Sequence, residues 1–123
     1  MNTIALIDRY CLVWTEPDAG RRKEMLAAIW APNATYTDPS IHAAGAAELL
    51  AHIARMQVKR PGARVLRTSI VDVHHDLARF AWHVVLSNAS VMIEGIDIAF
   101  LTRDGSRIER IIGFFGPLPR EAA

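Results

Sequence analysis

At about residue 63 the spacing of apolar residues changes from a helical period to a period of two, which limits the possible folds more than any other feature of the chain. Before that point apolar residues recur every three or four positions, as in helices that bury one face. After it they follow the alternation typical of strands, in four segments: residues 63–74, 78–87, 91–102 and 107–115. Helices followed by strands indicate an α+β fold with helices packed on one face of an antiparallel sheet.

Three helices are expected in the first half of the chain. The second helix begins after Asp18, a typical N-cap residue, and ends at Pro32. The third covers residues 46–56, and a short strand over residues 34–38, ended by Pro39, lies between the two. The first helix buries a stripe of apolar and aromatic residues, namely Leu6, Ile7, Tyr10, Cys11, Val13 and Trp14.

The strands are expected to form hairpins, because only three or four residues separate consecutive segments. The connecting residues are His75-Asp76, Asn88-Ala89-Ser90 and Asp104-Gly105, and the last pair is the strongest turn signal. The strand over residues 78–87 is apolar on both faces. We therefore expect one face of the sheet to cover a core or cavity and the other face to contact a further surface.

Size and charge narrow the class of protein. The chain of 123 residues is the length of one domain, so we expect a single domain over residues 1–123. The net charge of +1 gives no field that would attract nucleic acid. Its one cysteine, Cys11, allows no internal disulfide and fits a reducing, cytoplasmic location. No membrane-spanning segment is expected, because no apolar run approaches 18 residues. No signal peptide is expected, because Asp8 and Arg9 interrupt the N-terminal apolar stretch, which also lacks a basic region before it.

The chain lacks the sequence motifs of several enzyme classes. It contains no Gly-rich phosphate loop, no G-x-S-x-G motif and no H-E-x-x-H motif. The five histidines do not have the spacing of a metal site, so neither a metal ion nor another cofactor is expected. We place His52 on a solvated helix face and His74-His75 at the end of a strand.

Asp97 is unusual because it lies in the otherwise almost wholly apolar segment VMIEGIDIAF. An ionised carboxylate is very costly to bury unpaired, so this group is paired, protonated or exposed. One interpretation is a neutral buried acid. The other is an edge strand with Asp97 turned to solvent, and the pattern alone gives the two equal weight. Glu94, on the opposite strand parity, is the better candidate for simple solvation.

Tyr10 and Asp38 have ordinary interpretations when each is taken alone. Asp38 precedes Pro39 at the end of a strand, where an aspartate commonly shapes a turn. Tyr10 lies on the buried stripe of the first helix, and a buried phenol usually finds a hydrogen-bond partner in the backbone.

The order of elements and three short motifs resemble the nuclear transport factor 2-like superfamily, which includes SnoaL-like polyketide cyclases and ketosteroid isomerases. The resemblance extends from about Ile4 to Gly116, and the motifs IDRY, ATYTDP and GIDIAF are most similar to ketosteroid isomerase. It implies a single SnoaL-like domain with a cone-shaped α+β fold, in which three N-terminal helices pack on a curved antiparallel or mixed sheet and enclose a pocket. Relatives commonly form homodimers, so a homodimer is expected.

The resemblance also implies roles for three residues. Tyr10 corresponds to an oxyanion-hole tyrosine, Asp38 to a catalytic base and Asp97 to a protonated aspartic acid. The function implied is proton transfer next to a carbonyl group of a hydrophobic small molecule. Candidate residues for lining the substrate pocket are Trp14, Trp30, Tyr36, His42, Met56, Phe80, Trp82, Met92, Phe100 and Phe114.

Two alternatives remain open. An epoxide hydrolase on the same fold needs an arginine between two acids, for which Arg64, Arg67 and Arg79 are candidates. A non-catalytic ligand-binding or dimerisation module predicts that Asp38 and Asp97 face solvent or pair with arginine rather than converge on Tyr10.

Overall fold

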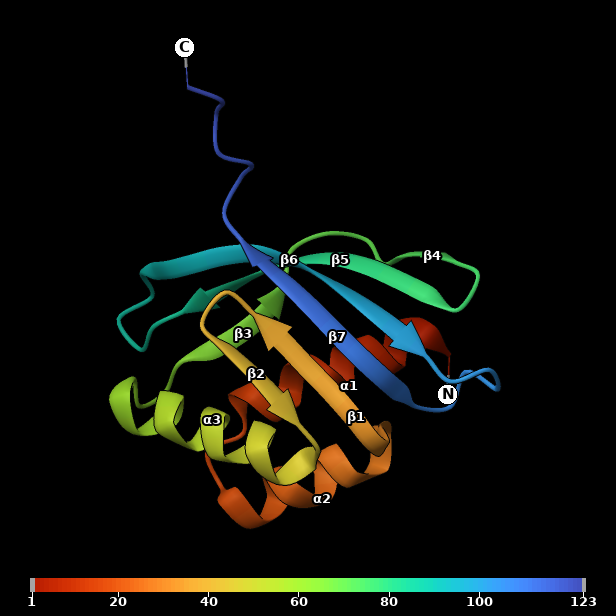
Figure 1. Ribbon diagram of the computed structural model, residues 1–123. Helices are drawn as coiled ribbons and strands as arrows, with labels where there is room; N and C mark the ends of the chain where they lie inside the picture. Colours follow the sequence, from red (N-terminus) through yellow and green to blue (C-terminus); the bar gives the residue numbers. More distant parts are fainter. Residues whose placement is uncertain (1, 123) are drawn as a thin grey trace.

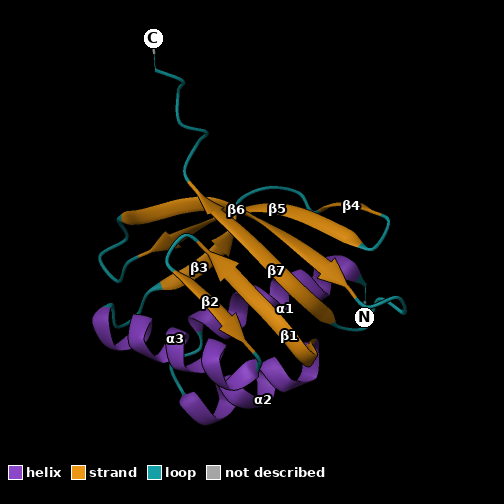
Figure 2. Cartoon of the chain, in the orientation of Figure 1, coloured by secondary structure: helices purple, strands orange, loops and turns teal. Residues whose placement is uncertain are grey.

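Three helices cover one face of a seven-stranded sheet in the computed structural model, which describes residues 2–122 (Figures 1 and 2). The helices are α1 (Thr3–Thr15), α2 (Ala19–Ile29) and α3 (Ala46–Lys59). The strands are β1 (Trp30–Asp38), β2 (Ile41–Ala44), β3 (Arg64–Arg67), β4 (Asp72–His74), β5 (Leu77–Val85), β6 (Val91–Leu101) and β7 (Ile108–Phe115). The α+β class and the cone-like arrangement are as expected.

The sheet is mixed and open. Its strand order is β2-β1-β7-β6-β5-β3, and β4 pairs with β5 beside β3. Only β1 and β7 run parallel; the other neighbours are antiparallel. The hairpin at His75 and Asp76 has positive φ at both residues, which matches the twist of the strands that it joins.

Strand β1 begins earlier than expected, because Pro32 and Asn33 do not end the second helix. The helix ends at Ile29, and Trp30 already lies in the strand. Pro32 has no N–H to donate and Asn33 has a φ of 65°, so the register between β1 and β7 shifts between Trp30 and Thr35. The two residues therefore make an irregularity within the strand rather than a helix stop.

Two further differences have local causes. Strand β2 was not predicted, because IHAA is short and only Ala43 in it is buried. The segment expected as one strand over residues 63–74 divides into β3 and β4. There the side-chain hydroxyl of Ser69 accepts the N–H of Ala81 at 2.8 Å, in place of a backbone carbonyl.

The main core lies between the helices and the inner face of the sheet. α1 buries the predicted stripe, from Leu6 to Trp14, against the strands, and Asn2 caps its first turn by accepting the N–H of Ala5. Asp18 caps α2 by accepting the N–H of Arg21 at 2.8 Å, as expected. Across residues 2–122, no helix is long and apolar enough to cross a membrane.

Candidate active site

A cavity of about 230 Å³ lies between the helices and the inner face of the sheet. Its wall is mostly apolar and aromatic, with a few polar groups, which is typical of a small-molecule site. The residues that line it are Tyr10, Trp14, Tyr36, Asp38, Ser40, His52, Met56, Val65, Phe80, Trp82, Val84, Met92, Ile93, Asp97 and Phe115.

Strand register brings the two predicted carboxyl groups together. Asp97 of β6 lies opposite Gly113 of β7, and Thr37 of β1 lies opposite Ile112, which sets Asp38 beside Gly113. A β-carbon on Gly113 would lie 2.5 Å from Oδ1 of Asp97 and 3.6 Å from Cβ of Asp38. The absence of a side chain at Gly113 therefore provides the space into which the Asp97 carboxyl group projects, next to Asp38.

Asp97 is a buried acid, and only 3% of its surface is exposed. Its Oδ1 accepts a hydrogen bond of 2.8 Å from Nε1 of Trp82, whose indole lies over Gly95, where a β-carbon would come within 2.6 Å of the ring. Burial raises the pKa of Asp97 to about 7; the Trp82 hydrogen bond opposes the rise and the charge of Asp38 adds to it. A large share of the Asp97 side chains is therefore protonated near neutral pH.

Asp38 lies at the end of β1 and is nearly buried, with 9% exposed. Its Oδ1 accepts hydrogen bonds from the backbone N–H and the hydroxyl of Ser40, at 2.7 and 2.6 Å, and from the N–H of Ile41 at 3.1 Å. Its Oδ2 accepts the hydroxyl of Tyr36 at 2.5 Å. These four donors stabilise a carboxylate and fix its position at the wall of the cavity.

Tyr36 donates a hydrogen bond to Asp38 and keeps its own proton. Burial, the charge of Asp97 and the hydrogen bond to Asp38 all raise the pKa of Tyr36 far above its usual value. The strand alternation that points Asp38 inward also points Tyr36 inward, because the two are separated by one residue.

The hydroxyl of Tyr10 is buried, and no residue between 2 and 122 forms a hydrogen bond with it. The Tyr10 ring stacks on Trp30, with centroids 6.2 Å apart, and meets the edge of Phe80 at 6.4 Å. Burial and the charge of Asp97 raise the pKa of Tyr10, so the phenol keeps its proton. A buried donor without a partner is costly, and the Tyr10 side chain forms part of the cavity wall. This unpaired donor is the most informative feature of the site.

His52 lines the cavity from α3 and does not lie on a solvated helix face, as the sequence indicated. Its ring packs against Trp14 and Tyr36, with centroids 5.7 and 6.4 Å away. Partial burial lowers the pKa of His52. The negative charge of Asp38 opposes this lowering, and the positive charge of Arg55 adds to it. His52 is therefore a neutral imidazole at pH 7.

Of the ten residues expected to line the pocket, six do so: Trp14, Tyr36, Met56, Phe80, Trp82 and Met92. The other four lie elsewhere, each for a physical reason. Trp30 lies behind the ring of Tyr10, and the exposed His42 bonds the hydroxyl of Thr37 at 2.7 Å. Phe100 and Phe114 have the opposite strand parity to Asp97 and Gly113, so they lie on the outer face of the sheet.

Six lining residues were not predicted, namely His52, Ser40, Val65, Val84, Ile93 and Phe115. Three of them share strand parity with residues already assigned to the cavity. Ile93 alternates with Asp97, Phe115 lies two residues after Gly113, and Val84 lies two after Trp82. Parity would have found these three residues once Asp97 was known to point inward.

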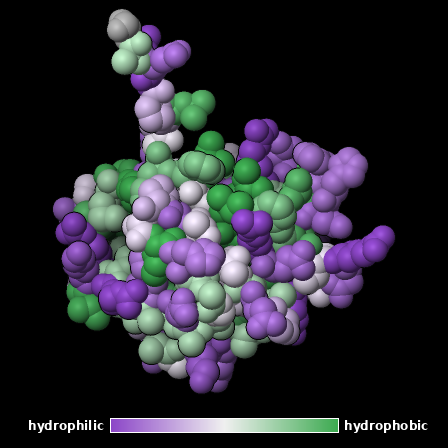
Figure 3. Space-filling model, in the orientation of Figure 1, coloured by the Kyte–Doolittle hydropathy of each residue, from purple (hydrophilic) through white to green (hydrophobic). Residues whose placement is uncertain are grey.

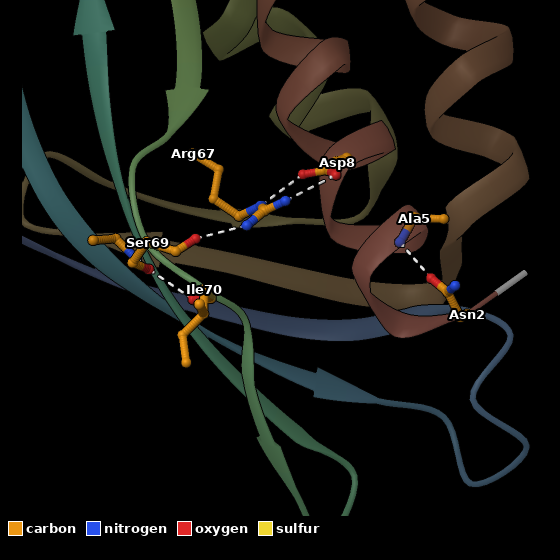
Figure 4. Close-up of polar contacts among 7 residues, drawn as sticks. Asn2, Ala5, Asp8, Arg67, Ser69 and Ile70 are labelled. Carbon is orange, nitrogen blue, oxygen red and sulfur yellow. Dashed lines mark hydrogen bonds and ion pairs between the residues drawn. The ribbon is translucent and has the colours of Figure 1, made fainter.

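None of the three candidate arginines for epoxide hydrolysis lines the cavity. Arg67 forms a two-pronged ion pair with Asp8 of α1 and also donates to the carbonyl of Ser69 (Figure 4). Arg79 pairs with Asp72 at 2.7 Å on the other face of the sheet, and Arg64 is exposed. Within residues 2–122, no His, Cys, Asp and Glu side chains form a group of three that could hold a metal ion.

Solved structures with the same arrangement identify the fold. A protein from Agrobacterium tumefaciens strain C58, described as a "putative isomerase of the SnoaL-like family", is 28% identical with a TM-score of 0.85, over 92% of this chain and 96% of that one. An NTF2-like protein of unknown function from Exiguobacterium is 16% identical with a TM-score of 0.71, over 92% and 99% of the two chains. The chain belongs to the nuclear transport factor 2-like superfamily.

Within this superfamily, the chain is also similar to a "putative ketosteroid isomerase" from Kribbella flavida. That protein is 19% identical with a TM-score of 0.62, over 98% of this chain and 82% of that one, so it supports the fold alone. No family model and no curated protein matches the sequence. The nuclear transport factor 2-like fold is thus established by structure.

Proposed function

We propose that this nuclear transport factor 2-like protein is an acid–base enzyme of the ketosteroid isomerase or polyketide cyclase type, which moves a proton next to a carbonyl group of a hydrophobic substrate. The observation that carries the proposal is that Tyr10, whose buried hydroxyl has no hydrogen-bond partner among residues 2–122, lines the same cavity as Asp97 and Asp38. Structural neighbours described as isomerases and as a polyketide cyclase add support.

Tyr10 and Asp97 are the proposed donors to the substrate oxygen. Removing a proton next to a carbonyl leaves negative charge on that oxygen, and donors fixed in a dry cavity stabilise the charge better than water does. Burial keeps the phenol of Tyr10 protonated and raises the pKa of Asp97 to about 7. A protonated aspartic acid in an apolar site is the arrangement known in ketosteroid isomerase, and it explains why an acid lies in GIDIAF.

Asp38 is the proposed base. It lies at the cavity wall beside Asp97, and its hydrogen bonds with Tyr36 and Ser40 hold it in one orientation. A carboxylate positioned within hydrogen-bond reach of a substrate C–H typically contributes a factor of about 10² to 10⁴ in rate. Protonation of another carbon of the same substrate by Asp38 completes the reaction, so the net reaction is an isomerisation.

An isomerisation assay tests this function. The substrates are β,γ-unsaturated cyclic ketones of one or two rings, and conjugation of the double bond is followed by ultraviolet absorbance. We expect conversion by the wild type and a loss of about 10²-fold or more in Asp38→Asn and in Tyr10→Phe. Glu94→Gln, on an exposed position of β6, is the matched control and keeps full activity.

Full activity in Asp38→Asn, or no activity of the wild type on any of several such ketones, refutes proton transfer by this site. A non-catalytic binding module is the alternative. It is disfavoured by the burial of Asp38 and Asp97 in one cavity with Tyr10, where neither acid forms an ion pair with a residue between 2 and 122.

A homodimer through the outer face of the sheet is the proposed oligomeric state. On β6 and β7, Ile96 lies opposite Phe114, and these side chains are 44% and 62% exposed. Figure 3 shows hydrophobic surface gathered over β5, β6 and β7 on this face. Such a patch is costly in water and favours a second copy as its cover. Light scattering should give about twice the monomer mass for the wild type and the monomer mass for Phe114→Lys.

A cytoplasmic location is proposed from Cys11. The chain has one cysteine, which lies buried on α1 as a free thiol. Burial and the charge of Asp97 raise the pKa of Cys11 to about 12, so it stays a thiol rather than a reactive thiolate.

A further inference from the structure

A wide groove continues outward from the mouth of the cavity. The cavity and the groove share Ser40, His52, Met56 and Met92, so a molecule bound in the cavity extends directly into the groove. The groove runs along the C-terminal half of α3 and faces the beginning of β6 at Met92. A substrate longer than the cavity can therefore extend its other end into this groove.

Three basic residues line this groove and no acidic residue does. Arg55, Lys59 and Arg60 are exposed, and none of them forms an ion pair with the residues between 2 and 122. In Figure 3, hydrophilic surface lies next to hydrophobic surface over this end of α3. The groove thus offers positive charge beside apolar contact area.

The helical repeat aligns this charge with the cavity. Positions 52, 55, 56 and 59 fall on one face of α3 at the spacing i, i+3, i+4 and i+7. His52 and Met56 line the cavity, and Arg55 and Lys59 extend the same stripe to the groove.

We propose that the substrate carries an anionic group, a carboxylate or a phosphate, which Arg55, Lys59 and Arg60 hold in this groove while the ring of the substrate occupies the cavity. This inference rests on the proposed function, because it takes the carbonyl end of the substrate to be the end near Tyr10. Basic residues in the last turn of a helix also stabilise the helix dipole. That structural role accounts for Lys59 and Arg60 but not for Arg55, one turn earlier.

The size of the cavity agrees with a substrate of one or two rings. An apolar cavity of about 150 Å³ holds benzene, and this cavity is larger by about half. The rest of a longer substrate then lies in the groove, where cations attract an anionic group strongly at low ionic strength.

Three naphthols test the proposal by equilibrium binding. The probes are 2-naphthol, 6-hydroxy-2-naphthoate and 6-hydroxy-2-naphthyl phosphate. Each has a phenol for the Tyr10 end, and the latter two place an anionic group at the far end of the rings. Quenching of the fluorescence of Trp14 and Trp82, which line the cavity, reports binding. The proteins are the wild type, Arg55→Gln/Lys59→Gln and the control Arg9→Gln/Lys23→Gln, which alters exposed residues outside the groove.

We expect the wild type and the control to bind at least one anionic naphthol about five- to tenfold more tightly than 2-naphthol in low salt. The Arg55→Gln/Lys59→Gln variant should lose this preference and bind 2-naphthol unchanged. Tighter binding of 6-hydroxy-2-naphthoate than of the naphthyl phosphate indicates that the substrate is a free carboxylic acid. Tighter binding of the naphthyl phosphate indicates that the substrate is attached to a phosphorylated carrier.

Equal binding of the three naphthols by the wild type, or a preference that survives in Arg55→Gln/Lys59→Gln, overturns the proposed anion site even if the protein isomerises neutral ketones. Groove-dependent binding without any isomerase activity overturns the proposed reaction and leaves the anion site standing. If no naphthol binds, the anion site is refuted, and the isomerisation assay alone decides the proposed reaction.

Discussion

Replacing Asp97 by asparagine tests whether the buried acid of β6 is neutral in the folded protein. Asparagine has the same shape, and its Oδ1 can still accept the hydrogen bond of 2.8 Å from Trp82. It cannot ionise. Any effect of this substitution that depends on pH between 4 and 9 therefore reports the ionisation of Asp97.

The pKa of Asp97 rises from 3.8 to about 7 on folding, with burial as the main cause. At about 1.4 kcal/mol for each pH unit, this rise corresponds to a cost of about 4 kcal/mol for holding the ionised group in the fold. Between pH 4 and 7 the folded protein keeps a proton that the unfolded chain has released, so the free energy of unfolding falls as pH rises. Above pH 7 both states are ionised at this position and the loss is complete.

The assay is urea unfolding, followed by tryptophan fluorescence at pH 4, 5.5, 7 and 8.5 and at a fixed protein concentration. We expect Asp97→Asn to match the wild type at pH 4 and to be more stable by up to about 4 kcal/mol at pH 8.5. Glu94→Gln serves as the control, because Glu94 lies on the same strand but is exposed. A difference between Asp97→Asn and the wild type that stays constant with pH would refute the neutral acid.

Three further predictions follow from single contacts. Tyr10→Phe removes a buried hydroxyl without a partner, so chemical denaturation should show a gain of about 1–2 kcal/mol in the free energy of unfolding, while the isomerase assay shows a large loss. Gly113→Ala puts a β-carbon 2.5 Å from Oδ1 of Asp97, which should cost about 1–3 kcal/mol in the same measurement and weaken 2-naphthol binding; unchanged values of both would contradict the packing described. Cys11 should react with a thiol reagent at pH 8 only after urea unfolding, and rapid labelling of the native protein would show that α1 is not packed as found.

The sequence predicted the elements that have strong periodicity and failed where one or two residues decide the path of the backbone. The stripe from Leu6 to Trp14 defined α1, and the turn residues His75 and Asp76 lie where expected. The strand irregularity at Pro32 and Asn33 was not foreseen, because the same residues also end helices. β2 was missed because a strand with one buried side chain has no pattern to detect.

The sequence also could not show which side chains face the cavity. The alternation of side chains along a strand divides its residues into two faces but does not say which face is inner. Phe114 was therefore expected in the cavity, although Gly113 is the residue of β7 that faces it. His52 was missed because a histidine among polar residues of a helix looks solvated, and only the packing of α3 against Trp14 shows that it is not.

Exchange of substrate protons with solvent tests the central claim most directly, because it detects proton removal even when no product accumulates. A two-ring cyclic ketone is incubated in deuterated water with the wild type, Asp38→Asn or Glu94→Gln, and deuterium at the carbon next to the carbonyl is followed by nuclear magnetic resonance. The account predicts rapid exchange with the wild type and Glu94→Gln, and exchange at least about 10²-fold slower with Asp38→Asn. Equal rates with the wild type and Asp38→Asn, or no exchange above the rate in buffer, would contradict it.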